Sequence, residues 1–501
     1  MDTSDLLIQA FAQTLSLGGL LAIFSGVLIG QVVGALPGIG PAAGMALLLP
    51  VTFGMEADKA VMMLAGICYG GMYGGTVTSV LINVPGESSS VMAAIEGHQL
   101  AKRGRAGAAL SVAAIGSFFA GTVGTVALAL AATALSAIAL KFNAPEFFLL
   151  ALLGIIATAM LGTSSPVKAL LMAVIGLMIA LVGIDPISGV NRLTFGSSYL
   201  LDGFEFLPVA IGLFGIGEVL ASLESLKHER PLTTHLRDMW LTRTEWADSR
   251  MSIVRGSAIG FCVGLMPGAG ATVSAFLAYV VERRFSKHPE RFGKGAIDGI
   301  AASESANNSS VTGALAPMLA LGIPGSTGTA VLLAALVLQG IRPGPMLMTE
   351  QPLLVWSLIA SMFLGNVILL VLNLPLAPLF AMVLRIPYVY LAPAIISFSL
   401  VGAYAASMSF NTAVIAVAFG IIGYFMIKAD LPRAPLVLAL VLAPLVEESL
   451  RQSLLLSLGS PMIFVYRPVS LVLMVSIIGI FLIPFVLAMW RRRKSEITNG
   501  N

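Results

Sequence analysis

Two Pro-Gly dipeptides followed by small hydroxyl residues have the composition of an anion-binding site. They lie in NVPGESSS (residues 83–90) and in GIPGSTGT (residues 322–329) of a chain of 501 residues. If a helix begins after each Pro-Gly, its first N–H groups and its positive dipole end can bind a carboxylate without a lysine or an arginine. The hydroxyls can donate further hydrogen bonds to the carboxylate oxygens. We therefore expect the substrate to be bound by Pro85, Gly86, Ser88, Ser89, Ser90, Pro324, Gly325, Ser326 and Thr327.

Two further Pro-Gly motifs, LPGIGP (residues 36–41) and MPGAGA (residues 266–271), have features of a cation site. Proline removes a helical hydrogen bond, and glycine permits backbone conformations that other residues avoid. Carbonyl groups freed at such breaks can hold a dehydrated sodium ion, because hard oxygen ligands suit hard cations. A polar run over residues 304–310 adds two amide side chains. The expected cation ligands are Gly38, Gly40, Gly268, Gly270, Asn307 and Asn308.

Four acidic residues stand out in or beside the apolar segments. Glu87 and Glu304 lie inside apolar surroundings, where a carboxylate is by default a functional candidate, although both can equally cap a helix or pair with a neighbour. Glu218 and Glu447 stand at matching places near helix ends, and for them we favour a structural role. For the Pro-Gly motifs themselves, the alternative is that the prolines only kink packed helices.

The composition indicates that membrane helices must position these residues. Hydrophobic residues make up 57% of the chain and charged residues 11%, against about 25% charged in a soluble protein. Apolar runs of the length that spans a bilayer recur along the chain, for example at 16–34, 106–140 and 204–223. Continuous runs favour helices over an outer-membrane barrel. We expect an all-α polytopic membrane protein with broken or re-entrant helices at the midplane, where paired breaks mark transporter sites.

The motifs belong to an internal repeat. VGALPGIG (33–40) reappears as VGLMPGAG (263–270), 230 positions later (264 − 34), and NVPGES reappears as GIPGST with an offset of 239 (325 − 86). The predicted organisation is a first transmembrane repeat at 15–223, a polar cytoplasmic linker at 224–255, a second repeat at 256–452 and an extra C-terminal transmembrane helix at 468–490.

Loop charges suggest that the two repeats are inverted. The basic loop at 98–105 has a counterpart at 341–352 with only Arg342, whereas the basic loop at 283–294 corresponds to a first-half loop with only Lys59. Basic loops mark the cytoplasmic side. We expect a multi-pass protein of the bacterial inner membrane, with a periplasmic N-terminus and a cytoplasmic linker and C-terminus. Parallel repeats with irregular loop charge are the alternative.

Other functions lack their signatures. A net charge of +3 does not indicate a nucleic-acid partner. The four histidines (98, 228, 235 and 288) are expected in charged loops, which argues against an intramembrane haem or histidine-metal centre. Neither a P-loop nor HExxH occurs. We expect no catalytic residues, no cofactor, and no metal other than a co-transported sodium ion.

Long motifs in both halves resemble one transporter family. They are GALPGIGPAAGMALLLPVTFGM (34–55), YGGMYGGTVTSVLINVPGESSSV (69–91) and EGHQLAKRGRAGAAL (96–110), then GLMPGAGATVSAFLAY (264–279), GIAASESANNSSVTGALAPMLALGIPGSTGTAVLLAAL (299–336) and VLAPLVEESLRQSL (441–454). The chain closely resembles the large membrane subunit of the tripartite tricarboxylate transporters over nearly its whole length.

This resemblance implies a secondary transporter with three components. A periplasmic substrate-binding protein captures the substrate, a small membrane subunit accompanies the large one, and the large subunit forms the translocation path. Members take up citrate and related tricarboxylates, dicarboxylates or aromatic acids, driven by Na⁺ or H⁺. An elevator motion follows by analogy alone. The sequence names neither the carboxylate nor the ion, and it leaves open whether the subunit forms a homodimer.

Two other function classes compete with a coupled transporter. A passive channel would lack the saturable, ion-dependent uptake that paired broken helices indicate. A membrane-embedded enzyme would need an intramembrane catalytic constellation, such as histidine with carboxylates, and the histidine positions argue against one.

Overall fold

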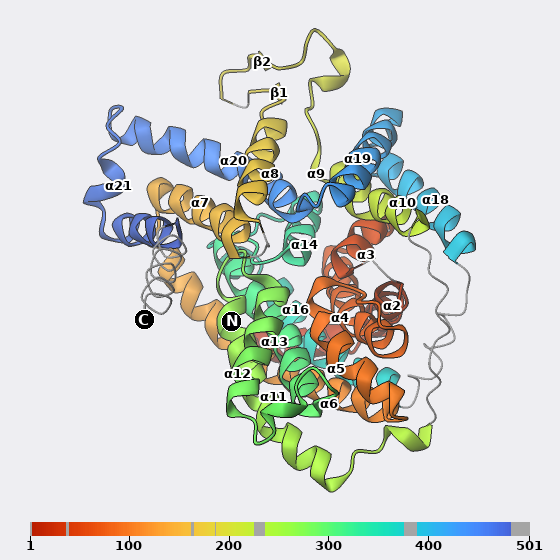
Figure 1. The fold of residues 1–501 in the computed structure, drawn as a ribbon. Helices are drawn as coiled ribbons and strands as arrows, with labels where there is room; N and C mark the ends of the chain where they lie inside the picture. The colour runs from red at the N-terminus through yellow and green to blue at the C-terminus, as the bar shows by residue number, and fades with distance from the viewer. Residues whose placement is uncertain are drawn as a thin grey trace, which may run out of the picture.

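The protein is a bundle of helices that frequently stop and restart (Figure 1). The computed structural model describes residues 3–36, 40–161, 165–185, 187–224, 236–374 and 388–481. Gly38, residues 225–235 of the predicted linker and residues 482–490 of the predicted last helix lie outside the described residues. The strands in the described part are β1 (Gly183–Ile184) and β2 (Asn191–Arg192), which pair antiparallel. The predicted all-α polytopic fold is confirmed.

Six helices are long and apolar enough to cross a membrane among the described residues. They include α2 (Leu17–Gly34), α4 (Ala57–Ile82), α6 (Ala106–Ala139), α16 (Pro352–Asn373) and α19 (Phe410–Lys428). The sixth runs through α9 (Phe206–Ala210), the π-helical η4 (Ile211–Ile216) and α10 (Gly217–Glu224).

Shorter helices fill the remainder of the bundle. In the first half they are α1 (Thr3–Thr14), α3 (Pro41–Leu48), η1 (Leu49–Gly54), η2 (Ser88–Ser90), α5 (Val91–Lys102), α7 (Ala144–Leu161) and α8 (Pro166–Ala180). In the second half they are α12 (Gly270–Phe285), α14 (Thr327–Leu338), α15 (Leu347–Glu350), α18 (Tyr388–Ser407), α21 (Ile463–Tyr466) and the helix Pro468–Phe481. The longer α11 (Arg243–Gly264), α13 (Ile297–Leu321) and α20 (Arg433–Leu456), with the short η3 (Ser198–Leu200), η5 (Leu236–Met239) and η6 (Pro289–Arg291), complete the described helices. Because α11 begins at Arg243, residues 243–255 of the range assigned to the linker are helical.

The two halves contain the same glycine-mediated helix pair. A Cβ on Gly26, Gly30 or Gly34 of α2 would lie 2.1–2.3 Å from a backbone oxygen of α4, at Met63, Ile67 and Gly71 respectively. Residues 256, 260 and 264 of α11, also glycines, abut the backbone oxygens of residues 302, 306 and 310 of α13 in the same way. The first set is displaced by 230 positions (256 − 26) and the second by 239 (302 − 63), as in the repeated motifs. Only glycine lets two backbones approach so closely.

The centre of the bundle is formed by α4 and α13. Nearly every residue of both helices is buried, from Ala60 to Leu81 and from Ile297 to Ala320. The core side of α13 includes the polar run at 303–310, all of it buried. By contrast, large apolar side chains are exposed on the outer helices α6, α8, α18 and α19, as expected for surfaces in contact with lipid.

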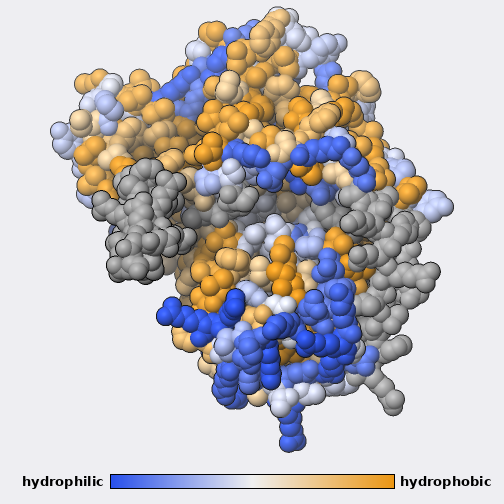
Figure 2. All heavy atoms as spheres, in the orientation of Figure 1, coloured by the Kyte–Doolittle hydropathy of each residue, from blue (hydrophilic) through white to orange (hydrophobic). Residues whose placement is uncertain are grey.

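Polar side chains gather at one end of the molecule, over α5, α11 and α12 (Figures 1 and 2). There Arg105 is hydrogen-bonded to Glu245, and Arg291 lies 3.7 Å from Asp248. The Glu96 carboxylate of α5 accepts backbone N–H groups from the loop that follows α12. The loops that follow α5 and α12 therefore lie at the same end. His98, expected in a charged loop, is instead buried in α5 against the Val80 carbonyl.

The β-hairpin lies at the opposite end (Figure 1). Arg192 of β2 is 2.6 Å from Glu447 of α20, and Arg451 of α20 is 2.8 Å from Asp185 beside β1. Arg451 also lies 2.7 Å from Glu447. This network of four charges attaches the hairpin to α20.

Candidate functional site

A cavity of about 460 Å³ lies between the two halves. It is lined by the first residues of five helices: α3 (Gly40–Ala43), η2 with its continuation α5 (Glu87–Ser89), α12 (Gly270–Thr272), α14 (Ser326–Gly328) and α20 (Arg433–Pro435). The first N–H groups of a helix have no partner within the helix, and the dipole makes this end positive. Five such ends around one space favour an anion.

Capping boxes shape two of these helix starts. Helices α4 and α13 are followed by the C-cap residues Asn83 and Gly322, both in left-handed conformation. After each turn, an extended segment leads to the next N-cap, Glu87 or Ser326. Ser326 accepts the Thr329 N–H at 3.2 Å, and Thr329 accepts the Ser326 N–H at 2.9 Å.

These caps decide which N–H groups remain for a ligand. In α14 the backbone N–H groups of Ser326 and Thr329 donate to the side chains of the capping box. Thr327 and Gly328 are the first two residues of the helix, so their N–H groups have no acceptor within it. The side chain of Thr327 lines the cavity. This start therefore combines free backbone donors with a hydroxyl, the arrangement that binds a carboxylate.

The Pro-Gly motif at residues 266–271, the third along the chain, makes close contacts of its own. Gly268 has φ +82°, and a Cβ there would lie 2.1 Å from the Thr158 hydroxyl of α7. Its N–H donates to the Gly325 carbonyl at 3.1 Å. This hydrogen bond joins the motif at 266–271 directly to the motif at 322–329. The Gly325 carbonyl accepts it.

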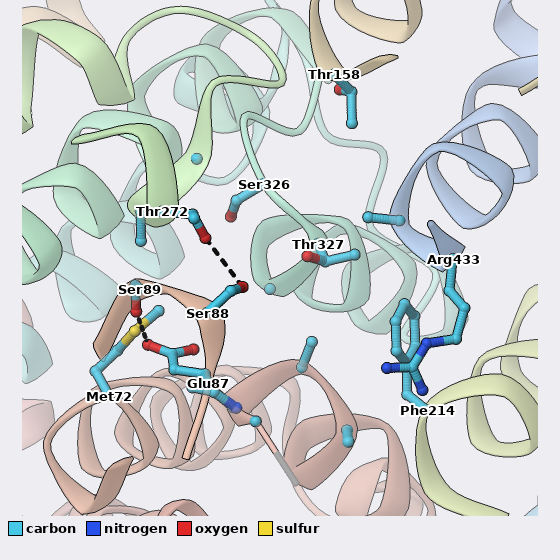
Figure 3. Close-up of a pocket in the computed structure, with 18 of the residues that line it drawn as sticks. Met72, Glu87, Ser88, Ser89, Thr158, Phe214, Thr272, Ser326, Thr327 and Arg433 are labelled. Carbon is cyan, nitrogen blue, oxygen red and sulfur yellow. Dashed lines mark hydrogen bonds between the residues drawn. The ribbon is translucent and has the colours of Figure 1, made fainter. Parts of the chain in front are cut away.

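Hydroxyls from both halves meet in the cavity (Figure 3). Ser88 Oγ and Thr272 Oγ1 lie 3.1 Å apart. Ser89 donates to the Glu87 carboxylate, which is partly exposed to the cavity. Ser326 and Thr327 lie across the space from Glu87.

Some of the predicted site residues line the cavity and others do not. Those that line it are Gly40, Pro85, Gly86, Ser88, Ser89, Gly268, Gly270, Ser326 and Thr327. Ser90, Pro324, Gly325, Asn307 and Asn308 are buried away from its lining, and Gly38 is outside the described residues. Glycines predicted to bind a cation therefore line the same cavity as hydroxyl residues predicted to bind the substrate.

One wall of the cavity carries an ion pair that the sequence analysis did not assign to the site. Arg433 Nη2 lies 2.6 Å from Glu218, its Nη1 donates to the Leu213 carbonyl at 2.8 Å, and its guanidinium lies over the Phe214 ring at 5.3 Å (Figure 3). Leu213 and Phe214 belong to the π-helical turn η4, a feature frequent at functional sites. No local pattern marks Arg433, because its partners come from a helix more than 200 positions earlier.

A second polar cluster lies beside the cavity, in α13. Thr76 of α4 donates to Glu304 at 2.7 Å, while Asn308 donates to Ser117 at 2.6 Å. Asn307 lies beside Glu87. Apart from Glu87, the residues of this cluster lie away from the cavity lining.

Comparison with known proteins gives a consistent set of relatives. The sequence model described as "Tripartite tricarboxylate transporter TctA family" matches residues 20–438. A protein of Agrobacterium vitis described as "Uncharacterized 52.8 kDa protein in TAR-I ttuC' 3'region" is 44% identical over 471 residues, which cover 94% of each chain. Another from that organism, "Uncharacterized protein in TAR-II ttuC' 3'region", is 41% identical over 230 residues, 46% of this chain and 93% of its own. No solved structure gives a significant match.

Proposed function

The chain belongs to the tripartite tricarboxylate transporter TctA family, and on this premise we propose that it carries small carboxylates through its central cavity, driven by an ion gradient. The resemblance inferred from the motifs is confirmed. The family is a transporter component rather than an enzyme family, and it works with a binding protein and a small membrane subunit. The protein is the large, multi-pass membrane subunit of such a system.

The observation that carries the proposal is the convergence of helix starts on one cavity. Five helices begin at its wall, and hydroxyls of Ser88, Thr272 and Thr327 line it. We propose that backbone N–H groups and these hydroxyls hold the carboxylate. Arg433 is neutralised by Glu218, so it leaves no unpaired buried charge when the cavity is empty.

The site's own charge suggests why a cation accompanies the substrate. Its lining holds two carboxylates, Glu87 and Glu218, and one cation, Arg433. A di- or trianion entering this site requires compensating positive charge. Co-transported Na⁺ or H⁺ would supply it and would couple the two fluxes.

Topology and partners follow from the same premise. We propose that the basic end of the molecule faces the cytoplasm of a bacterial inner membrane. The hairpin end then faces the periplasm, from which the binding protein delivers substrate. The N-terminus is proposed to be periplasmic and the C-terminus cytoplasmic.

The experiment is uptake by the complete system. The three subunits are expressed in a bacterial host that lacks carboxylate uptake, and labelled citrate, dicarboxylates and aromatic acids are supplied in turn. We expect saturable accumulation of one class above its external concentration, abolished when the ion gradients are collapsed. Equilibration without accumulation would indicate a channel, and transport of none of these acids would refute the proposal.

A further inference from the structure

Glu304 is a carboxylate at the centre of the bundle without a basic partner among the described residues. We propose that Glu304, together with Asn307 and Glu87, binds the cation whose gradient drives transport. This inference rests on the proposed function and names the residues that would couple it to an ion.

The geometry leaves ligand positions open around Glu304. Its side chain is 0% exposed, and Thr76 donates to Oε2 at 2.7 Å, while Oε1 has no hydrogen-bond partner. One turn further along α13, Asn307 is also 0% exposed, and its amide lies beside the Glu87 carboxylate without forming a hydrogen bond of ordinary geometry among the described residues. Buried polar atoms without partners are uncommon in folded proteins, and these belong to a carboxylate and an amide that neighbour Glu87 at the cavity wall, where a cation could bind them.

The cluster is connected to the substrate cavity. Asn307 lies beside Glu87, and the Glu87 and Glu304 carboxylates are close enough to repel each other. Gly75 of α4 packs against the Glu87 backbone N–H, and the next residue, Thr76, bonds Glu304. Glu87 itself lines the cavity. The three side chains therefore form a row from the cavity wall into the core.

Electrostatics requires a positive charge in this row. An ionised carboxylate taken out of water is strongly disfavoured unless it is paired. Here the Glu87 carboxylate acts electrostatically on that of Glu304, and no arginine or lysine of the described chain forms an ion pair with either. A small hard cation resolves this, either a proton on a carboxylate oxygen or a sodium ion among carboxylate and amide oxygens.

The internal repeat argues against a purely structural role. With the offset of 239, the first-half equivalents of Glu304 and Asn307 are Ala65 and Cys68, and the second-half equivalent of Glu87 is Ser326. Cys68 lies 3.5 Å from a Cβ built on Gly328, the second-half equivalent of Ser89, so it too lies beside the start of a helix from the other half. The same backbone arrangement thus forms with alanine, cysteine and serine. Packing alone does not require the two carboxylates and the amide.

A coupling mechanism follows from this position. Without the cation, the negative charge of Glu87 at the wall repels a carboxylate substrate. With the cation bound between Glu87 and Glu304, that charge is compensated and the helix N-termini dominate the field in the cavity. Cation and substrate would therefore bind best together, as symport requires.

The test uses the three-subunit complex in proteoliposomes with imposed pH or sodium gradients. Glu304→Gln carries a neutral isostere of the cation-bound carboxyl. We expect it to retain exchange of labelled carboxylate across the membrane in the absence of gradients, and to lose both gradient-driven accumulation and cation-dependent affinity. Glu146→Gln is the matched control, because Glu146 is a buried glutamate that already has a cationic partner, Arg467 at 2.6 Å. It should retain wild-type cation dependence.

A chemical probe distinguishes the two cations. A hydrophobic carbodiimide modifies protonated carboxyl groups in the membrane, so its attachment to Glu304 can be mapped by mass spectrometry. A proton site would lose labelling as pH rises regardless of sodium, whereas a sodium site would be protected by sodium at constant pH. Absence of both labelling effects would overturn the inference.

A second variant guards against misfolding of the first. Asn307→Ala should lower cation affinity while substrate exchange at saturating cation persists. Asn373→Ala removes an equally buried amide whose atoms also have no partner, and should have no such effect. If the wild-type complex transports no carboxylate under any gradient, the proposed function fails. If it transports and neither Glu304→Gln nor Asn307→Ala changes its cation dependence, this inference alone fails.

Discussion

Ser88 and Thr272 lie with their hydroxyl oxygens 3.1 Å apart, although 184 positions separate them in the chain. Ser88 begins the helix after the second Pro-Gly break, and Thr272 lies in the first turn after the third. The contact shows how the two halves are combined. Each half contributes helix starts to one cavity, so neither half alone contains the site.

The first prediction concerns the hydroxyls of the cavity. Thr327→Ala removes a donor aimed at the proposed carboxylate position without altering the capping box of Ser326 and Thr329. We expect substrate affinity to weaken by about 1–3 kcal/mol, or roughly 5- to 150-fold. Binding of labelled substrate to the purified complex measures this. Thr349→Ala, an exposed threonine whose hydroxyl bonds only Met346, is the control. Equal affinity in both variants would place the carboxylate elsewhere.

The second prediction tests the repeated helix pair. Gly30→Ala and Gly260→Ala each place a Cβ 2.3 Å from a backbone oxygen, of Ile67 and Ala306 respectively. Forced separation of the helices should destabilise each variant by about 1–3 kcal/mol. Thermal unfolding in detergent measures the loss. Gly479→Ala, which would meet no atom within 4 Å, should unfold like the wild type. A wild-type melting temperature in either helix-pair variant would contradict the close packing.

Part of this arrangement could be predicted from the sequence. The offsets of 230 and 239 between Pro-Gly motifs recur between the glycine contacts of the two helix pairs, as the predicted internal repeat would require. The orientation of individual side chains could not be predicted. Ser90 lies in the predicted motif, yet its hydroxyl turns back to its own helix cap at Glu87. Asn308 turns toward Ser117 rather than the cavity.

The remaining site residues depend on long-range packing. Thr158 reaches the cavity because α7 packs closely against the turn at Gly268, whose positive φ glycine adopts readily. Arg433 and Phe214 meet through the contact of α20 with η4. Hydrophobic helices carry little pattern that would specify which neighbours they choose, so these contacts had no signal in the sequence.

The third prediction concerns topology. The loops with Lys102-Arg103 and Arg283-Arg284 lie at the same end of the molecule, linked through Glu96 and the backbone of residues 295–296. By the positive-inside rule both should face the cytoplasm. Single cysteines introduced at Arg103 and Arg284 should resist a membrane-impermeant reagent in intact cells and react in opened cells. A cysteine at Phe195, on the opposite hairpin end, should react in both. Labelling at Arg103 or Arg284 from outside would contradict the inverted topology.

The fourth prediction concerns pH and the hairpin. The hydrogen bond from Arg451, with backbone N–H groups of Ile187 and Ser188, holds the pKa of Asp185 well below its usual value. A depressed carboxylate pKa contributes stability that is complete above the unfolded pKa of about 4 and is lost only as pH falls through the lower folded value. Hydrogen exchange of residues 183–192 should therefore be protected equally from pH 5 to pH 8. Asp185→Asn should remove this protection at every pH, whereas the exposed Asp202→Asn should not.

The last prediction separates two ways of holding the substrate. Arg433 faces the cavity, but Glu218 lies 2.6 Å from it and Leu213 takes another of its N–H groups. If helix N-termini and hydroxyls bind the carboxylate, removing both charges together should have little effect on affinity. The double variant Arg433→Gln, Glu218→Gln preserves the net charge of the site and should bind substrate within about threefold of wild type, a change below 1 kcal/mol.

Single variants distinguish the pair from its members. Arg433→Gln alone leaves the negative charge of Glu218 unpaired beside the cavity, so it should weaken anion binding. Glu218→Gln alone frees the guanidinium and should strengthen binding of substrates with more carboxylates most, because the extra charge finds a partner. Binding of mono-, di- and tricarboxylates to all three variants measures both trends. A loss in the double variant as large as in Arg433→Gln would make the arginine, rather than the helix starts, the principal ligand of the carboxylate.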